Sequence, residues 1–392
     1  MVYQWTQSEK DRIVENILEI AAQTHKKPNP TGRNINISIT YENQGKISHK
    51  IEFNLSNKYL DKYENFKKKI MLKGKWFDKF TESSISSRLD NLLIDAVQYQ
   101  DSNRLLLLLN KIIDYFDNYH EKVTVYLPID GMIFEEDYLE IGDIVLKQER
   151  VKEEENFRKQ LFAEYTTIAE EKRAIERAEE ETRRIIDILR YANAPSKTVI
   201  GIRGDINPIH YTVPIISRGE LIYMKINQGV SENTTHFIES MKDKGLFELA
   251  KLLKKDYSEL SEFERTIFRG IHWISLSQIQ REPENELLNL ITCLETFLTA
   301  EYGNPITNTI AEGVAIILES ELEKRKIIKQ SIKEFYKNRS KISHGGNKAI
   351  LTSDLDKLRK LVIEFTQKMI DLRREFQDRK SLLQWIEDQK LG

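Results

Sequence analysis

Apolar and polar positions follow two different periods in the first part of the chain. Helical spacing of apolar residues covers residues 7–23 and returns over residues 57–120. Between these stretches, isoleucines alternate with polar residues over residues 35–40, which is typical of a strand, and residues 47–55 have the pattern of its hairpin partner. Breaks in the second helical stretch are expected near Gly74 and Gln100.

Strand-like alternation occurs twice more before the chain becomes helical. One β segment begins at Lys122 and continues through residues 138–147, with a turn at Gly142. A further β segment is expected in three pieces, at residues 198–202, 211–216 and 221–226. After His236 every pattern is helical to the C-terminus.

Charged residues dominate residues 149–191. Glu and Arg side chains three or four positions apart stabilise helices, so we expect a long solvated helix or helix pair at about residues 149–192. The apolar residues of this segment, such as Phe157, Leu161 and Tyr165, are too sparse for a sustained heptad seam. We therefore expect a helix that lies on the body of the protein, with a coiled coil as the alternative.

The change from mixed to helical patterns marks the expected domain boundary. We predict an α+β region over residues 1–235, in one or two subdomains, and an all-α domain over residues 236–392. The whole chain is expected to be predominantly α. The sequence shows no internal repeat and no low-complexity tract.

Composition limits how the chain could hold a nucleic acid and where it works. Lys and Arg number 60 and Asp and Glu 62, so the net charge of −2 gives no overall attraction to nucleic acid. RNA would have to be held by a local patch. The one cysteine, Cys293, excludes an intrachain disulfide and a cysteine-based zinc cluster, and it fits a reducing compartment.

The sequence predicts neither export nor membrane insertion. The first residues carry early charges and no unbroken apolar core, so no secretion signal is expected. The longest apolar run, residues 105–109, is far shorter than the roughly 18 residues that a membrane helix needs. Histidine spacing and glycine-rich loops suggest no metal site and no nucleotide-binding loop. We expect a cytoplasmic protein with no membrane partner, metal or cofactor.

Basic and aromatic residues alternate over residues 64–80, where several lysines lie among Phe66, Trp76, Phe77 and Phe80. Such a mixture suits single-stranded nucleic acid, because bases stack on aromatic rings while lysines follow the phosphates. It suits an ordinary amphipathic helix equally well, with the rings in the core. The sequence leaves both interpretations open.

The segment KNRSKISHGG, residues 337–346, carries the clearest candidate chemistry. Arg339 can hold a phosphate with its planar fork, and His344, five positions later, can move protons near neutral pH. On a straight helix, five residues rotate by about 500°, so the two side chains would point about 140° apart. They converge on one phosphate if the helix frays at His344, which Gly345 and Gly346 favour, or if another subunit completes the site.

The sequence around this motif resembles the Apea-like HEPN family. The succession is ENELLNLITCLETFLTAEYG (residues 284–303), PITNTIAEGVAIIL from Pro305, and EKRKIIKQSIKEFYKNRSKISHGG (residues 323–346). The resemblance covers roughly residues 263–374, under a third of the chain. It implies an all-α HEPN bundle, homodimeric through this domain, of a group in which many members are metal-independent ribonucleases.

Position by position, Arg339 and His344 match the family's catalytic pair, and Glu295 matches an acidic residue on its first helix. Glu295 would either form an ion pair that orients Arg339 or act as a catalytic acid or base. Tyr336 and Ser340 match flanking positions, and Tyr336 could stack or hydrogen-bond at the site or pack in the core. Many HEPN proteins have Asn, Asp or His directly after the arginine, so Ser340 departs from that pattern. The candidates for contact with RNA are Lys337 and Lys341.

The resemblance implies an endoribonuclease that acts in anti-phage defence by abortive infection. Neutral His344 would take the proton of a 2′-hydroxyl, and a protonated copy across the dimer would donate to the leaving 5′-oxygen. The products would be 2′,3′-cyclic phosphate and 5′-hydroxyl ends, and DNA would be spared. The N-terminal region would then sense an unknown phage trigger or hold the nuclease inactive.

Two other functions fit the same sequence. The domain could be a non-catalytic HEPN module for dimerisation or ligand binding, in which case Arg339 and His344 would be dispensable. It could also be a toxin that a separate antitoxin neutralises. Toxicity of the chain expressed alone, relieved by a neighbouring gene, would identify the toxin.

Overall fold

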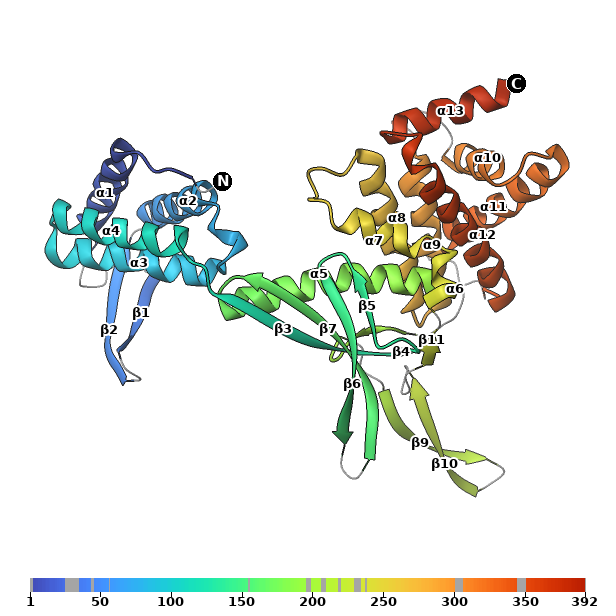
Figure 1. Cartoon of the computed structure of the whole chain (residues 1–392), viewed down its shortest axis with the longest axis horizontal. Helices are drawn as coiled ribbons and strands as arrows, with labels where there is room; N and C mark the ends of the chain where they lie inside the picture. The colour runs from blue at the N-terminus through green and yellow to red at the C-terminus, as the bar shows by residue number, and fades with distance from the viewer. Residues whose placement is uncertain are drawn as a thin grey trace. The chain divides into compact units, whose positions relative to one another are not determined.

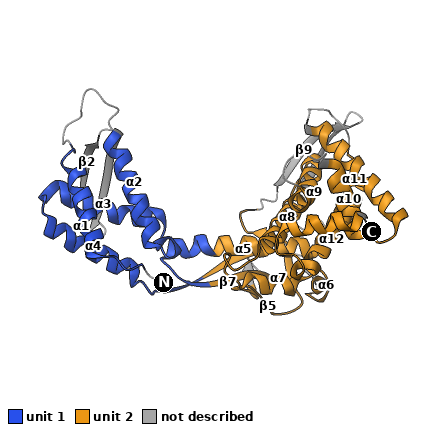
Figure 2. Ribbon diagram, turned by 90° about the horizontal axis from the view of Figure 1, so that it is seen from above, with its two compact units in different colours: residues 1–124, 166–177 blue, residues 125–165, 178–392 orange. Residues whose placement is uncertain are grey.

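The computed structural model describes most of the chain (Figure 1). Contacts divide it into two compact units, which Figure 2 shows in different colours. The first unit comprises residues 1–124 and 166–177, and the second comprises residues 125–165 and 178–392. The described residues are 3–24, 35–43, 46–55, 57–153, 156–194, 199–205, 209–217, 220–228, 234–236, 238–299, 306–343 and 350–391.

Helices α1 to α4 supply the core of the first unit. Their apolar faces bury side chains such as Ile17, Leu89 and Leu109 almost completely. Thr or Asp side chains cap the first turn of α1, α3 and α4. The predicted breaks are confirmed, because helices end at Gly74 and just before Gln100. The bounds are α1 (Gln7–Ala21), α2 (Asn57–Gly74), the 3₁₀-helix η1 (Trp76–Asp78), α3 (Glu82–Tyr99) and α4 (Ser102–Asp117).

The predicted N-terminal hairpin is also confirmed. Strand β1 (Ile35–Asn43) pairs antiparallel with β2 (Lys46–Leu55), and Ile39 lies opposite Ile51. Isoleucine at every second position favours an extended backbone, because its branched Cβ is easily accommodated on a pleated strand.

The basic and aromatic run over residues 64–80 takes part in the core of the first unit. Trp76 and Phe80 are only 3% and 1% exposed. Lys67 is buried as well, and its Nζ lies 3.2 Å from Oδ1 of Asp90. These rings are not available to stack with bases, so the amphipathic-helix interpretation is the better supported of the two.

A five-stranded sheet follows, with the strand order β5–β6–β7–β3–β8. The pairs β5–β6, β6–β7 and β3–β8 are antiparallel. Gly142, between β5 and β6, has φ +60°, which is the turn conformation that glycine favours. The predicted β segments are present, and two further pairs, antiparallel β9–β10 and parallel β4–β11, accompany the sheet. The bounds are β3 (Lys122–Asp130), β4 (Met132–Phe134), β5 (Tyr138–Ile141), β6 (Ile144–Glu153), β7 (Asn156–Ile168), β8 (Gly201–Ile202), β9 (Ile209–Ser217), β10 (Glu220–Gln228) and β11 (Thr234–His236).

The helix expected at about residues 149–192 is wrong over its first half. Residues 149–153 belong to the end of β6, residues 156–168 form β7, and the helix α5 spans Glu171–Asn193. The apolar spacing explains the error: Leu161 and Tyr165 are four positions apart, which places them on one face of a helix but equally on one face of a strand. Ala163, between them, is also buried, so every second residue faces the core, as in a strand.

The chain is helical after β11, as predicted, over the residues that the structure describes. Helical elements therefore dominate the C-terminal half, while the sheet lies in the N-terminal half. No described helix combines the length and the apolar character required to cross a membrane. The bounds are α6 (Ile238–Lys242), α7 (Leu246–Leu253), α8 (Glu262–Gln278), α9 (Pro283–Leu298), α10 (Ile306–Leu318), α11 (Leu322–Ser343), α12 (Thr352–Asp371), the 3₁₀-helix η2 (Leu372–Arg374) and α13 (Arg379–Leu391).

One hydrophobic core runs through the sheet, α5 and the C-terminal helices of the second unit. It includes the fully buried Leu161 of β7, Ile188 of α5, Leu290 of α9 and Val362 of α12. Helices α8 and α9 approach closely where Gly270 faces the ring of Phe297. A Cβ atom at Gly270 would lie 2.4 Å from Cε2 of that ring, so the contact requires glycine.

His272 of α8 gives a prediction about pH. Its Nδ1 lies 2.8 Å from Oδ2 of Asp187 on α5, and this hydrogen bond raises the pKa of His272 above 6.5, although burial and the charge of Arg190 oppose the shift. The pair therefore stabilises the fold fully below pH 6.5, and the stabilisation is lost as the pH rises through the raised pKa. NMR titration of the His272 ring should give a pKa above 6.5 in the native chain and a lower one in Asp187→Asn. An unchanged pKa in that variant would contradict the pairing.

Candidate active site

Helix α9 positions the acidic candidate, Glu295. Pro283 starts the helix, where its missing N–H costs nothing, and an apolar stripe that includes Leu294 and Phe297 faces the core. The buried Arg359 of α12 forms an ion pair with the buried Glu286 of α9. Glu295 lies near the C-terminal end of the helix, with its side chain 19% exposed at the edge of the core.

Helix α11 positions the other candidates on one face. Ile332, Phe335 and Tyr336 are buried, and the next position at helical spacing is Arg339. Arg339 is therefore held at the edge of the core by the same stripe that docks the helix. Its side chain is 38% exposed, so the guanidinium is accessible to a ligand.

The structure brings Glu295, Tyr336 and Arg339 together. The hydroxyl of Tyr336 donates to Oε1 of Glu295 at 3.2 Å, and Nη2 of Arg339 donates to Oε2 at 3.4 Å. The same Nη2 lies 3.3 Å from Oε1, within ion-pair distance. This is the ion pair that an orienting role for Glu295 requires.

These side chains line a pocket of about 360 Å³. The Nε of Arg339 is buried and has no hydrogen-bond partner within the part of the chain that the structure describes. The guanidinium thus binds Glu295 through one nitrogen, and its remaining N–H groups have no partner among the described residues. The lining residues are Glu295, Thr299, Thr307, Tyr336, Arg339 and Ser340.

The chain was compared with known protein families, curated proteins and solved structures. No protein family, curated protein or solved structure matches it. Any assignment of function therefore rests on the residues of this chain and on their geometry.

Tyr336 is a hydrogen-bond donor and not a base at this site. Its burial, and then the negative charge of Glu295, raise the pKa of the phenol above 10. The hydroxyl accordingly stays protonated across the neutral range and continues to donate to the carboxylate of Glu295. Tyr336 combines the two roles that its sequence position left open, since the ring packs in the core and the hydroxyl contacts the site.

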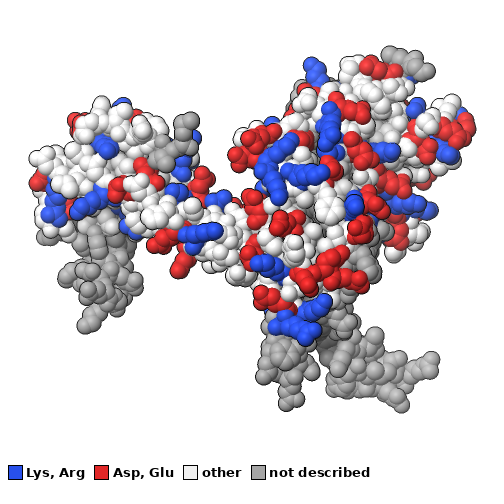
Figure 3. Space-filling model, viewed as in Figure 1, with Lys and Arg blue, Asp and Glu red and all other residues white. Residues whose placement is uncertain are grey.

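The other candidates lie on the exposed side of α11 or beyond it. Ser340 is exposed and lines the pocket, while Lys337 and Lys341 are exposed and form no ion pair with the described residues. His344 and the two glycines after it lie outside the described residues, and α11 is helical up to Ser343. Figure 3 shows basic and acidic side chains mixed over the described surface of the face in view.

Two threonines of the pocket were not among the residues predicted from the sequence. Thr299 ends α9, and its hydroxyl donates to the backbone carbonyl of Glu295 at 2.7 Å. Thr307 lies in the first turn of α10, directly across the pocket lining from α11. A threonine just after Pro305 at a helix start was the available signal, but only the tertiary arrangement shows that it reaches this site.

Proposed function

We propose that the C-terminal helices form a HEPN-like bundle and that the chain is a metal-independent endoribonuclease. The observation that carries the proposal is the ion pair between Glu295 and Arg339 in an open pocket. Arg339 precedes His344 by five positions, at the described end of α11. An arginine that is oriented by a carboxylate and is still accessible is suited to hold a phosphodiester.

Arg339 has a defined part in the proposed reaction. Glu295 holds Nη2 and the Arg339 side chain is 38% exposed, so the exposed part of the guanidinium is available to the nonbridging oxygens of a phosphate. The negative charge on those oxygens grows as the 2′-oxygen attacks phosphorus, and Arg339 stabilises it there. Tyr336 acts through Glu295, because its hydroxyl contacts that carboxylate.

His344 supplies the proton transfers in this proposal. One copy takes the proton of the 2′-hydroxyl as the bond between the 2′-oxygen and phosphorus forms. A second copy, from the other subunit of a homodimer, donates a proton to the 5′-oxygen as its bond to phosphorus breaks. The products are a 2′,3′-cyclic phosphate and a 5′-hydroxyl, so no metal is needed.

The biological setting rests on the resemblance to Apea-like HEPN proteins. We place the chain in anti-phage defence by abortive infection, in the cytoplasm, with RNA as substrate. The N-terminal region then has the role of sensor or regulator. A purified chain that is silent until a phage component is added would fit this role.

The test uses the full chain with labelled tRNA and mRNA in EDTA, beside His344→Ala. We expect cleavage with cyclic-phosphate ends by the native chain and its loss in the variant. His120→Ala, which changes an exposed histidine of the first unit, is the matched control and should cleave normally. Equal cleavage by His344→Ala would remove this histidine from the mechanism. Intact RNA with the native dimer under several phage triggers would favour a non-catalytic binding module.

A further inference from the structure

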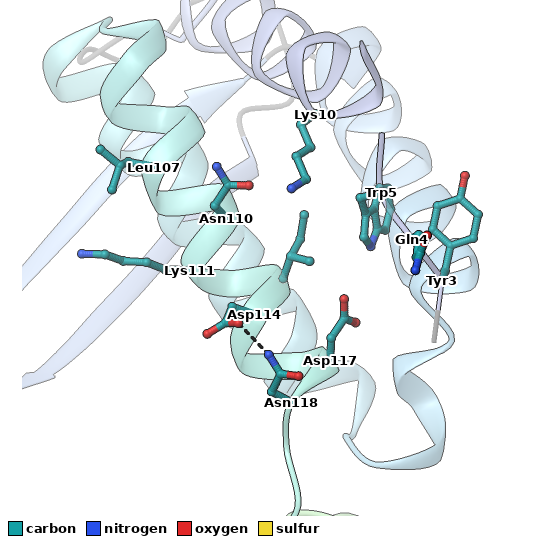
Figure 4. A pocket seen from close by; sticks show the side chains of 11 residues that line it. Tyr3, Gln4, Trp5, Lys10, Leu107, Asn110, Lys111, Asp114, Asp117 and Asn118 are labelled. Carbon is teal, nitrogen blue, oxygen red and sulfur yellow. Dashed lines mark hydrogen bonds between the residues drawn. The ribbon is translucent and has the colours of Figure 1, made fainter. Parts of the chain in front are cut away.

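A second pocket, of about 780 Å³, lies within the first unit, far along the sequence from the candidate active site. Figure 4 shows it between the N-terminal segment, the start of α1 and one face of α4. The pocket is large enough for a small organic ligand. Its lining residues are Tyr3, Gln4, Trp5, Lys10, Leu107, Asn110, Lys111, Ile113, Asp114, Asp117 and Asn118.

The charged groups of this pocket are balanced and unpaired. Lys10 and Lys111 form no ion pair with any described residue, and neither do Asp114 and Asp117. The two carboxylates accept only neutral donors: Asp114 accepts from the amide of Asn118 at 2.6 Å, and Asp117 accepts from a tryptophan indole at 2.8 Å. Lys10 and Asp117 are half-buried, and each lacks an ion-pair partner among the described residues.

Lys10 and Asp117 face the same space from opposite walls. In Figure 4 the ammonium of Lys10 descends from α1 and the carboxylate of Asp117 rises from α4, with Trp5 and Asn110 to either side. No contact within 4.0 Å joins the two charges. Burial raises the pKa of Asp117, so its carboxylate is partly withdrawn from water, while the hydrogen bond from Trp76 and the charges of Lys79 and Lys10 oppose the shift.

We propose that this pocket binds a small zwitterion, with its carboxylate on Lys10 and its ammonium on Asp117. The chemical class is a free α-amino acid with an apolar side chain, or a short peptide with free ends. Two cationic and two anionic groups cancel, so a ligand of zero net charge that carries both signs matches the lining best. A nucleotide carries several negative charges and no compensating cation, so it matches this balanced lining less well.

The apolar residues of the lining are the reason to expect an apolar side chain on the ligand. Ile113 and Leu107 are apolar residues of the lining, and Leu107 is 61% exposed. Covering this surface removes apolar area from water and adds affinity without any new polar group. A leucine-like or phenylalanine-like side chain fits this position better than a charged one.

The test is calorimetric titration of the full chain with leucine, phenylalanine and the dipeptide Leu-Leu. We expect saturable binding of at least one of them. N-acetyl-leucine and leucinamide, which each lack one charge, should bind at least about tenfold more weakly than leucine. Tighter binding of Leu-Leu than of leucine would identify the peptide as the source of the zwitterion.

Substitutions of Lys10 and Asp117 test whether these two charged groups hold the ligand. Lys10→Met and Asp117→Asn should each lower the affinity at least about tenfold. The asparagine keeps an oxygen for the indole of Trp76, so the wall of the pocket is preserved. Lys68→Met changes an exposed lysine of α2 outside the pocket and should bind like the native chain.

Three results would overturn the proposal. They are the absence of saturable binding up to about 10 mM ligand, equal binding of the blocked derivatives, and tighter binding of ATP or GTP than of any zwitterion. The readout is binding alone, so the proposal stands or falls independently of the ribonuclease activity.

Discussion

Replacing Arg339 by alanine is expected to lower the rate of RNA cleavage by about 10²–10³-fold, the usual cost of removing one preorganised donor to a charged transition state. Arg339→Lys should recover little of this loss. A single ammonium cannot bind Glu295 and present a planar fork to the phosphate at the same time. The measurement is the initial rate with a defined RNA, for variants whose unfolding midpoint matches the native chain.

The controls for this prediction separate orientation from acid–base catalysis. Arg325→Ala changes an arginine near the start of the same helix and should cut at the native rate. If Glu295 only orients Arg339, Glu295→Gln should be slower with an unchanged pH profile, and adding it to Arg339→Ala should cost little more. Loss of one limb of the pH profile in Glu295→Gln would instead make Glu295 the acid or base. Native rates in Arg339→Ala would exclude the proposed mechanism.

The substitution Gly270→Ala is expected to destabilise the chain by about 1–3 kcal/mol, as overpacking of a tight core does. The new Cβ would lie 2.4 and 2.7 Å from two atoms of the fully buried ring of Phe297. The gain in helix propensity from glycine to alanine is about 1 kcal/mol or less and does not offset this clash. Denaturant unfolding monitored by circular dichroism measures the difference.

A comparison within the same bundle tests this cause. At Gly313 of α10 a Cβ would lie 3.1 Å from the flexible ends of Leu298, so Gly313→Ala should cost less than Gly270→Ala. Phe297→Leu provides room, and the double variant with Gly270→Ala should be more stable than the sum of the single effects predicts. Additive effects would show that the ring is not the obstacle.

The spacing of apolar residues predicted the correct element wherever it fitted only one type of secondary structure. The alternating isoleucines around Ile39 gave the hairpin, and the helical stripes gave α1 to α4 and the C-terminal helices. It failed over β7, where charges at helical spacing and an apolar interval of four allowed a helix as well as a strand. Pairing with β6 decides the matter, and such pairing is not visible in a local pattern.

Part of the candidate site was also predictable from the spacing of residues along one helix. Tyr336 and Arg339 share one helical face, so their proximity follows from local spacing, and Glu295 was expected beside Arg339 through the family resemblance. Thr307 reaches the pocket only because α10 folds back on α11. The partner of His272, Asp187, lies 85 positions away in the sequence and could not have been inferred from spacing.

The shared core of the second unit determines which pieces of the chain could exist alone. A fragment beginning at residue 236 would keep Glu295 and Arg339 but lose the side chains of β7 and α5 that the helices bury, including Ile188 and Tyr191. It would also lose the hydrogen bond from the Tyr191 hydroxyl to Gln367 of α12. A protease that cut there would expose side chains that the C-terminal helices bury against β7 and α5. If the proposed ribonuclease is regulated, we therefore expect its activation to leave this boundary uncut.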